Sequence, residues 1–228
     1  MQQQDMVGLT LVVGLGKSGL ATARALRALG VAFAVTDSRA EPPGLAALRT
    51  ESPAAPQYLG GFDPVAFAGA ARLLVSPGIA VKTPVIAEAA ARGVPVWGDI
   101  ELLARLTPVP IAAITGSNGK STVTTLLGLM TERAGVRAAV GGNLGTPALE
   151  LWLRDERNSD AAPELYVLEL SSFQLETTHS LNARAATVLN ISPDHMDRYD
   201  TLDDYITAKR RIFRGHGAMV VNADDPVV

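Results

Sequence analysis

The stretch IAAITGSNGKST, Ile111–Thr122, joins an apolar run to a loop of small residues and decides the fold class. Its first five residues have the length and composition of a buried strand, and a helical pattern follows the loop as far as Met130. A strand, a glycine-containing loop and a helix in this order predict an α/β domain with a phosphate-binding loop. The alternative is a solvent-exposed turn with a surface lysine, and the flanking strand and helix favour the phosphate loop.

The loop is shorter than the common G-x-x-x-x-G-K spacing. Ile114 stands where that spacing needs a glycine, and the glycine present is Gly116. The chemistry is retained, because backbone N–H groups can surround phosphates and Lys120 can neutralise the charge of the β- and γ-phosphates. The hydroxyl of Ser121 can bind Mg²⁺.

Four strand candidates follow this helix along the chain: RAAVGGN (137–143), ELYVLELS (164–171), AATVLNIS (185–192) and AMVVN (218–222). The segment RDERNSDAAPE (154–164) is expected to be a polar loop. Polar residues gather where two of these strands end: Glu169, Asn190, Asp194, His195 and Asp197. Ligands of open parallel sheets bind at that edge.

These polar residues have simpler interpretations as well. Glu169 could hold Mg²⁺ or be an ordinary charge at a strand end. His195, taken alone, is more simply a loop histidine bonded to nearby backbone, and its place after a strand of this sheet favours a functional role. His179 and His216 lack such a context and are interpreted as structural.

The first half of the chain alternates strands and helices in the same way. GLTLVVGLG ends in glycines, a helical pattern runs from Ser18 to Leu29, and the further strand candidates are VAFAVTDS (31–38), ARLLVSPG (71–78) and VPVWG (94–98), the last preceded by the helix TPVIAEAAARG (83–93). This alternation predicts a parallel sheet with helices on both faces. The helix in DIELLARLTPVP ends at prolines, so we place a domain boundary there and expect domains at 1–106 and 107–228.

GLGKSG, Gly14–Gly19, fits the G-x-G-x-x-G pattern of a diphosphate-binding turn. Asp37 ends the next strand, where an acidic residue often contacts a ribose or a base. A dinucleotide and a UDP-sugar both present a diphosphate, so the pattern of this loop does not distinguish between the two ligands. The alternative is a tight strand–helix turn without a ligand.

Composition excludes several classes of protein. The 228 residues are 47% hydrophobic and 19% charged, with a net charge of −3 and no cysteine. We therefore expect a globular protein without disulfides, thiolate metal sites or a basic surface for nucleic acid. MQQQDM is not a signal peptide by pattern, and no apolar run is long enough to span a bilayer. The chain stops at NADDPVV directly after a strand, so we expect either that the second sheet is incomplete or that the natural protein is longer.

A lysine lies within an apolar stripe near the end of the chain. Thr201 and Asp204 form a helix start signal. At about 100° per residue one face of the helix collects Leu202, Tyr205, Ile206, Ile212 and Phe213. Lys209 falls in the middle of this face, while Arg210 and Arg211 point away and are expected to be ordinary surface charges.

A protonated lysine in such a stripe is costly unless it is paired. In one interpretation its stem is buried and the ammonium reaches an Asp or Glu at the surface. In the other, burial disfavours the charged form and lowers the pKa of the amine, so that the lysine is neutral.

The motifs taken together resemble the Mur ligases of bacterial cell-wall synthesis. The resemblance runs from about residue 9 to the end and rests on GLGKSG, DSR, SPGI, GDIELL, ITGSNGKST, GGNLGTP, LELSSFQLE and LNISPDHMDRY in this order. It implies two Rossmann-like parallel-sheet domains, a UDP-binding domain followed by an incomplete P-loop-type ATPase domain. The third domain of the family has no counterpart in this sequence, so we expect the chain alone to lack full activity.

The resemblance also implies the reaction and its partners. D-glutamate would be joined to UDP-N-acetylmuramoyl-L-alanine with ATP and Mg²⁺, through an acyl phosphate, in peptidoglycan precursor synthesis. A cytoplasmic monomer without nucleic-acid or membrane partners is expected. Two alternatives remain: a non-catalytic nucleotide-binding module, and a nicotinamide-dependent oxidoreductase, which would leave the second phosphate loop unexplained.

The site residues that the resemblance implies fall into three sets. UDP-substrate binding is expected at Gly16, Lys17, Ser18, Asp37, Ser38, Arg39, Ser76 and Gly78. ATP binding is expected at Gly116, Ser117, Asn118, Gly119, Lys120, Ser121 and Thr122. Catalytic residues are expected to be Lys120, Asn143, His195 and Lys209, with Mg²⁺ held by Ser121, Glu169, His195 and Lys209 as a carbamate.

Overall fold

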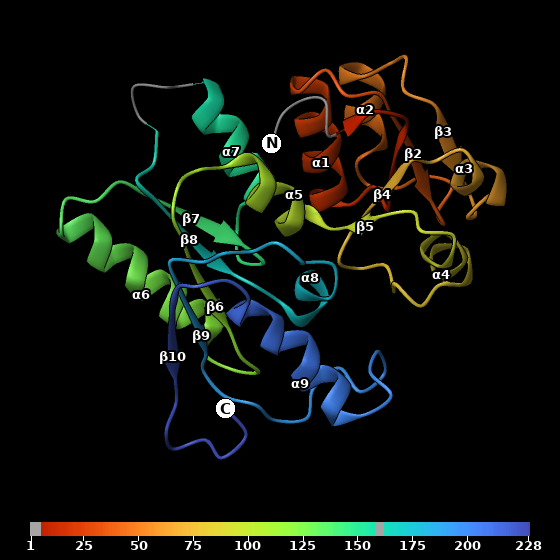
Figure 1. The fold of residues 1–228 in the computed structure, drawn as a ribbon. Helices are drawn as coiled ribbons and strands as arrows, with labels where there is room; N and C mark the ends of the chain where they lie inside the picture. Colours follow the sequence, from red (N-terminus) through yellow and green to blue (C-terminus); the bar gives the residue numbers. More distant parts are fainter. Residues whose placement is uncertain (1–5, 158–161) are drawn as a thin grey trace. The chain divides into compact units, whose positions relative to one another are not determined.

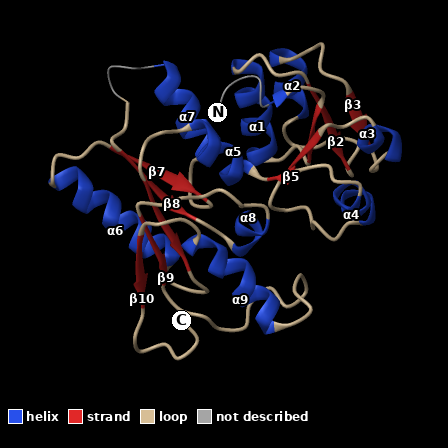
Figure 2. Cartoon of the chain, viewed as in Figure 1, coloured by secondary structure: helices blue, strands red, loops and turns tan. Residues whose placement is uncertain are grey.

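The structure, a computed structural model, describes residues 6–157 and 162–228 (Figure 1). It divides into two units, Met1–Leu102 and Leu103–Val228, and each contains one five-stranded sheet whose neighbouring strands are all parallel. Figure 2 shows how strands and helices alternate along the chain. The predicted α/β class with two parallel-sheet domains is confirmed.

The first unit has strand order β3-β2-β1-β4-β5. Its elements are β1 (Thr10–Val13), α1 (Lys17–Ala28), β2 (Phe33–Asp37), α2 (Leu45–Glu51), β3 (Gln57–Leu59), α3 (Pro64–Ala68), β4 (Arg72–Val75), α4 (Pro84–Ala91) and β5 (Val96–Trp97). β1 lies at the centre, fully buried, and its apolar side chains pack with those of β2, β4 and α3. Because the strands are parallel, β1, β2 and β4 end at one edge, where the residues proposed for the first ligand follow them.

The second unit has strand order β10-β9-β6-β8-β7. Its elements are β6 (Ile111–Thr115), α6 (Lys120–Arg133), β7 (Ala138–Gly142), α7 (Ala148–Arg157), β8 (Leu165–Glu169), α8 (Ser172–Glu176), β9 (Ala185–Val188), α9 (Leu202–Arg210), a 3₁₀ helix (Arg211–Phe213) and β10 (Ala218–Val221). β6 is central. Ile114 of β6 and Val167 of β8 form a hydrophobic cluster with Val123 and Leu127 of α6. The carboxyl ends of β6, β8 and β9 therefore meet at one edge.

Some elements differ from the expectation. The short elements α2, β3, α3 and α8 were not predicted, because three to seven residues carry too little periodicity to stand out. The prediction of a polar loop at 154–164 is wrong for residues 154–157, which form the end of α7. That helix is stabilised by Leu149, Trp152 and Leu153, which are buried on its inner face.

The boundary between the units falls between Leu102 and Leu103, inside α5 (Asp99–Leu106), four residues before the expected one. The expected boundary followed the prolines that end this helix. Residues 1–5, which carry most of the MQQQDM stretch, lie outside the described residues, as do residues 158–161 of the expected polar loop. Within residues 6–157 and 162–228, no helix has both the length and the apolar character needed to cross a bilayer.

Candidate functional site

The glycines of the second phosphate loop are required by its backbone. Gly116 has φ 153° and Gly119, the residue before α6, has φ 78°. A Cβ atom on Gly116 would lie 3.1 Å from Cβ of Leu189. The loop therefore turns sharply and brings the N-terminus of a 14-residue helix to the edge of the sheet, where backbone N–H groups and the helix dipole favour an anion.

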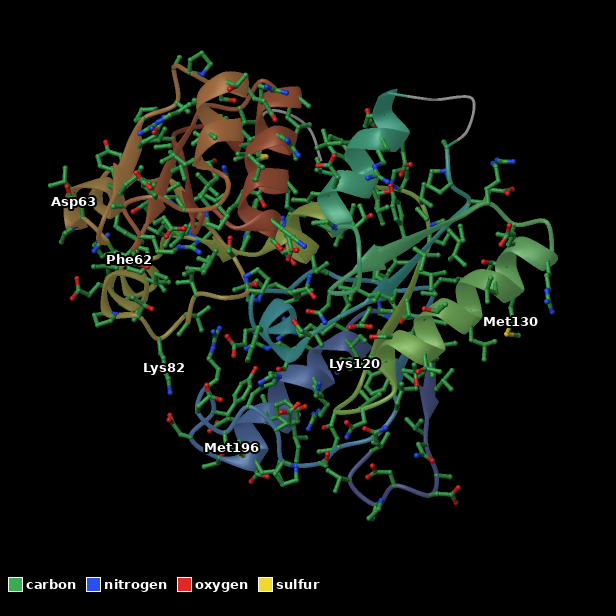
Figure 3. The ribbon with its side chains drawn as sticks, turned by 180° about the vertical axis from the view of Figure 1, so that it is seen from behind. Phe62, Asp63, Lys82, Lys120, Met130 and Met196 are labelled. Carbon is green, nitrogen blue, oxygen red and sulfur yellow. The ribbon has the colours of Figure 1, made fainter. Side chains whose placement is uncertain are left out.

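Lys120 is the first residue of α6, as Figure 3 shows. Its Nζ donates to the carbonyl oxygens of Gly116 and Ser117, at 3.0 Å each. The ammonium is thus folded back over the loop and held by neutral carbonyls. A phosphate group, which carries full negative charge, is a stronger partner for it than these carbonyls are.

Three residues of the expected site meet beside the loop. Glu169 ends β8, next to β6, and is buried. One of its carboxylate oxygens accepts a hydrogen bond from the Ser121 hydroxyl at 2.7 Å, and the other accepts one from the side-chain amide of Asn143 at 2.7 Å. Gly142 permits this approach, because a Cβ there would lie 2.4 Å from the Glu169 carbonyl oxygen.

The donor set fits Mg²⁺. Mg²⁺ prefers oxygen ligands and is usually held by one or two carboxylates together with water and substrate phosphates. Glu169 and Ser121 supply a carboxylate and a hydroxyl, and the loop can bring phosphates to them. Within the described part of the chain, no group of three or more His, Cys, Asp or Glu side chains lies where it could hold a metal ion.

Lys209 lies inside the protein under the phosphate loop. Its side chain is only 2% exposed, and Nζ donates to the Gly116 carbonyl at 2.8 Å and to Oγ1 of Thr115 at 3.3 Å. The Tyr205 ring lies 4.6 Å from the same nitrogen. Burial, and then the nearby charge of Lys120, lower the pKa of Lys209 to about 7. The amine is hydrogen-bonded to neutral oxygens, not carried to a surface carboxylate, which favours the second sequence interpretation.

The two arginines that follow differ from each other. Arg210 is exposed, as expected. Arg211 is half-buried and donates to the carbonyl oxygens of Leu175 and Glu176, so its assignment as an ordinary surface charge is wrong. The helix gives way to a 3₁₀ turn at Arg211, which carries its side chain toward the end of α8.

His195 lies in the loop between β9 and α9 in a left-handed conformation, φ 55°. Its carbonyl accepts N–H groups of Arg198 and Tyr199, and its ring packs on Phe173 with 4.7 Å between centroids. Nε2 lies 3.5 Å from a carboxylate oxygen of Asp194, and both side chains are almost half exposed. The contacts of the described residues join His195 to none of the Glu169, Ser121 and Lys209 side chains.

The other phosphate loop, in the first unit, is equally tight. Gly14 has φ 90°, and a Cβ on Gly19 would lie 1.8 Å from the Gly14 carbonyl oxygen. The Ser76 hydroxyl donates to that same oxygen at 2.8 Å. α1 begins directly after Gly16, so the expected ligand residues Gly16, Lys17 and Ser18 lie at a helix N-terminus. Lys17, Ser38, Arg39 and Gly78 are exposed at this edge of the sheet.

Asp37 is fully buried, and its carboxylate already accepts four hydrogen bonds. They come from the Leu15 N–H at 2.7 Å and from the Arg39 N–H, Nε and terminal nitrogen at 2.9, 2.8 and 2.7 Å. Burial alone would raise the pKa of Asp37, but these hydrogen bonds outweigh it and hold the pKa below its usual value. Contact between Asp37 and a ligand requires one of these bonds to open.

Three residues near the second loop were not identified from the sequence as site residues. Tyr205 donates to or accepts from the Ser117 hydroxyl at 3.0 Å, Thr115 contacts Lys209, and Ser192 donates its N–H to the Ser117 oxygen at 2.9 Å. The position of Tyr205 four residues before Lys209 was a usable signal, because residues so spaced share a helix face.

Two domain families match the sequence. Residues 114–228 match the Mur ligase middle domain, and residues 8–98 match the Mur ligase MurD-like N-terminal domain. The chain is 56% identical over 223 residues to UDP-N-acetylmuramoylalanine--D-glutamate ligase of Nitrosococcus oceani, covering 98% of this chain and 48% of that protein. It is 55% identical to the Pseudomonas aeruginosa protein of the same name, covering 94% and 46%. The chain thus spans about half the length of these relatives.

Solved structures share the fold at lower identity. UDP-N-acetylmuramate:L-alanyl-gamma-D-glutamyl-meso-diaminopimelate ligase from Neisseria meningitides matches with a TM-score of 0.60 and 18% identity, over 96% of this chain and 72% of that one. UDP-N-acetylmuramate-alanine ligase from Thermotoga maritima matches with a TM-score of 0.56 and 19% identity, over 97% and 50%.

Proposed function

The chain belongs to the Mur ligase family, and from that premise we propose that it is the substrate-binding and ATP-binding part of a ligase that joins D-glutamate to UDP-N-acetylmuramoyl-L-alanine. The observation that carries the proposal is the group formed by Ser121, Glu169 and Asn143 beside the Lys120 loop. A Mg²⁺-dependent phosphate site needs these residue types in this arrangement. The reaction of a nicotinamide-dependent oxidoreductase does not require such a Mg²⁺-dependent phosphate site.

The difficulty in this reaction is electrostatic. The substrate carboxylate must attack the γ-phosphate of ATP to form an acyl phosphate, which the amine of D-glutamate then attacks as phosphate leaves. At about 4 Å, two like unit charges repel by roughly 4 kcal/mol with an effective dielectric constant of 20. Several such pairs would prevent the approach.

Residues of the second unit reduce this repulsion. Lys120 is proposed to leave the loop carbonyls and pair with the β- and γ-phosphates, and the N-terminus of α6 adds partial positive charge at the same place. Asn143 and His195 are proposed to meet the substrate carboxylate. When bound at Ser121 and Glu169, with a second ion near His195, Mg²⁺ would neutralise phosphate charge and orient the triphosphate.

Lys209 is proposed to act as a carbamate. A neutral amine has two N–H donors and one lone pair, and the two hydrogen bonds to Gly116 and Thr115 account for both donors. The lone pair can then attack CO₂: a nitrogen–carbon bond forms as one carbon–oxygen π bond becomes a lone pair on oxygen, and the nitrogen releases one proton to water. The product is an anion that can hold Mg²⁺, whereas an ammonium cannot.

The N-terminal unit is proposed to bind the UDP part of the substrate through Gly16, Lys17, Ser18, Arg39, Ser76 and Gly78, with Asp37 and Ser38 beside them. Both nucleotides of the proposed reaction are cytoplasmic metabolites, so we propose a cytoplasmic location for the protein. We also propose that the protein is a monomer.

Calorimetric titration of the chain tests the proposal. UDP-N-acetylmuramoyl-L-alanine is expected to bind and NAD is expected not to bind, because the ligase reaction uses no hydride acceptor. Binding of NAD without any response to the UDP-sugar would favour the oxidoreductase. Binding of both nucleotides without turnover, even in a protein that includes the remaining half of its relatives' length, would favour a non-catalytic module.

A further inference from the structure

The second phosphate loop is divided into two halves that use their backbone groups differently. In the anchored half, Gly116–Asn118, backbone groups are bound by other parts of the protein. In the open half, Gly119–Thr122, the backbone begins α6. This division decides which N–H groups a phosphate can meet.

The first part of the anchored half is held by lysines and by side-chain hydroxyls. The Gly116 carbonyl accepts from both Lys120 and Lys209. The Ser117 hydroxyl donates to the Ser192 carbonyl at 2.9 Å and also contacts the Tyr205 hydroxyl. The Ser117 side chain is therefore turned away from the ligand edge and into the protein.

Asn190, which follows β9, holds the rest of the anchored half. Its backbone carbonyl accepts the Ser117 N–H at 3.0 Å. Its side-chain oxygen accepts the Asn118 N–H at 2.8 Å, and its side-chain nitrogen donates to the Asn118 carbonyl at 3.1 Å. One side chain thus satisfies both backbone groups of Asn118, as a neighbouring strand would.

Asn190 is itself fixed on both sides. The Leu189 carbonyl accepts from the Asn222 side chain at 3.0 Å, and the Ile191 N–H donates to the Asp225 carboxylate at 2.9 Å. The turn at Asn222–Asp225, which follows β10, is therefore hydrogen-bonded to the residues on both sides of Asn190. This arrangement makes Asn190 a rigid support and not a loose surface side chain.

The open half offers a different set of donors. The first hydrogen bond within this part of α6 runs from the Val123 N–H to the Gly119 carbonyl. The N–H groups of Lys120–Thr122 lie in the turn before it, where a helix has no acceptors of its own to offer. They point along the helix axis toward the ligand edge together with the positive end of the dipole.

We propose that Asn190 is the positioning residue of the phosphate loop, and that phosphate oxygens are received by the N–H groups of Gly119–Thr122 while those of Ser117 and Asn118 stay on Asn190. This inference rests on the proposed ATP site and refines it. The resemblance to the Mur ligases implied that Ser117 and Asn118 are ATP-binding residues. Their role here is to hold the loop in shape.

Amide NMR of the ¹⁵N-labelled chain titrated with Mg·ATP tests the inference, and millimolar ligand is usable where affinity is low. We expect the resonances of Gly119–Thr122 to shift most and the Asn118 N–H to keep its protection against hydrogen exchange. A shift of the Asn118 amide resonance as large as those of Gly119–Thr122 would show that its N–H turns to the phosphate, which overturns the inference and leaves the ATP site standing. No shift anywhere in the loop would overturn both.

Asn190→Ala gives the second arm of the experiment. The substitution removes both side-chain hydrogen bonds to the Asn118 backbone, so we expect Mg·ATP affinity to fall about 10-fold or more, and exchange of the Asn118 N–H to accelerate at least as much. Binding of UDP-N-acetylmuramoyl-L-alanine is expected to stay unchanged.

One control separates positioning from general stability. Asn182→Ala removes a similar hydrogen bond, to the His216 N–H at 2.9 Å, away from the phosphate loop, and is expected to leave ATP affinity within about twofold. Equal losses of Mg·ATP affinity in Asn190→Ala and Asn182→Ala would contradict the inference.

Discussion

Replacing Lys209 with methionine is expected to change how the stability of the second unit depends on pH. The two side chains have similar length, but methionine has no amine to desolvate. The Gly116 carbonyl keeps Lys120 as a donor, and Thr115 still donates to the Leu170 carbonyl, so the substitution leaves neither group without a partner. We therefore expect Lys209→Met to be more stable than the wild type at pH 7, by a few kcal/mol at most.

The pH dependence follows from the pKa of Lys209, which burial lowers from 10.5 to about 7 in the folded protein. Between these two values the unfolded chain holds a proton on the amine that the folded chain has lost. Stability of the wild type must therefore rise as pH increases through this window, with a slope that approaches about 1.4 kcal/mol per pH unit. From pH 7 to pH 9 the wild type should gain about 2 kcal/mol relative to Lys209→Met.

Urea unfolding at pH 7, 8 and 9 in CO₂-free buffer measures this difference. Trp152 is buried in the second unit and reports on its unfolding once Trp97 of the first unit is replaced by phenylalanine. Arg210→Met is the matched control, because Arg210 is the exposed neighbour on the same helix and its replacement should leave the pH dependence unchanged. Parallel stability curves for the wild type and Lys209→Met would refute the lowered pKa.

The remaining predictions concern binding and turnover. Gly116→Ala should weaken Mg·ATP binding at least about 10-fold in calorimetry, because φ 153° is strained for a residue with a side chain and the new Cβ would lie only 3.1 Å from Cβ of Leu189. This chain should show no phosphate release that depends on D-glutamate, and a rate on the order of 1 s⁻¹ or more would contradict that. In a protein with the full length of the relatives, Lys209→Ala should abolish ligation while Arg210→Ala retains most of it, and similar activities of the two variants would argue against the carbamate.

Local patterns predicted the parts of the site that depend on neighbours along the chain. Glycines at positive φ marked both loops, since Gly14 and Gly116 tolerate no side chain. The capping pair Thr201 and Asp204 marked the start of α9, where the Thr201 hydroxyl accepts the Asp204 N–H at 3.1 Å. Helical spacing alone was enough to place Lys209 on the buried face of α9, where its side chain lies.

Contacts between distant segments were not predictable in this way. The Leu15 N–H reaches the Asp37 carboxylate across 22 residues, and no local pattern shows this. Asn190 reaches Asn118 across 72 residues because β9 and β6 are neighbours, which depends on the strand order. Sequence spacing identifies such residues as polar and near a strand end, but not what they bind.

The dependence of ATP binding on Mg²⁺, measured calorimetrically for the wild type and Glu169→Gln, tests the central claim most directly. If Glu169 and Ser121 hold the cation of a Mg·ATP site, Mg²⁺ will strengthen ATP binding in the wild type, and this gain will shrink about 10-fold or more when the carboxylate is lost. ATP binding that is insensitive to Mg²⁺, or a gain of equal size in both proteins, would contradict the assignment of this edge of the sheet as the ATP site of a ligase.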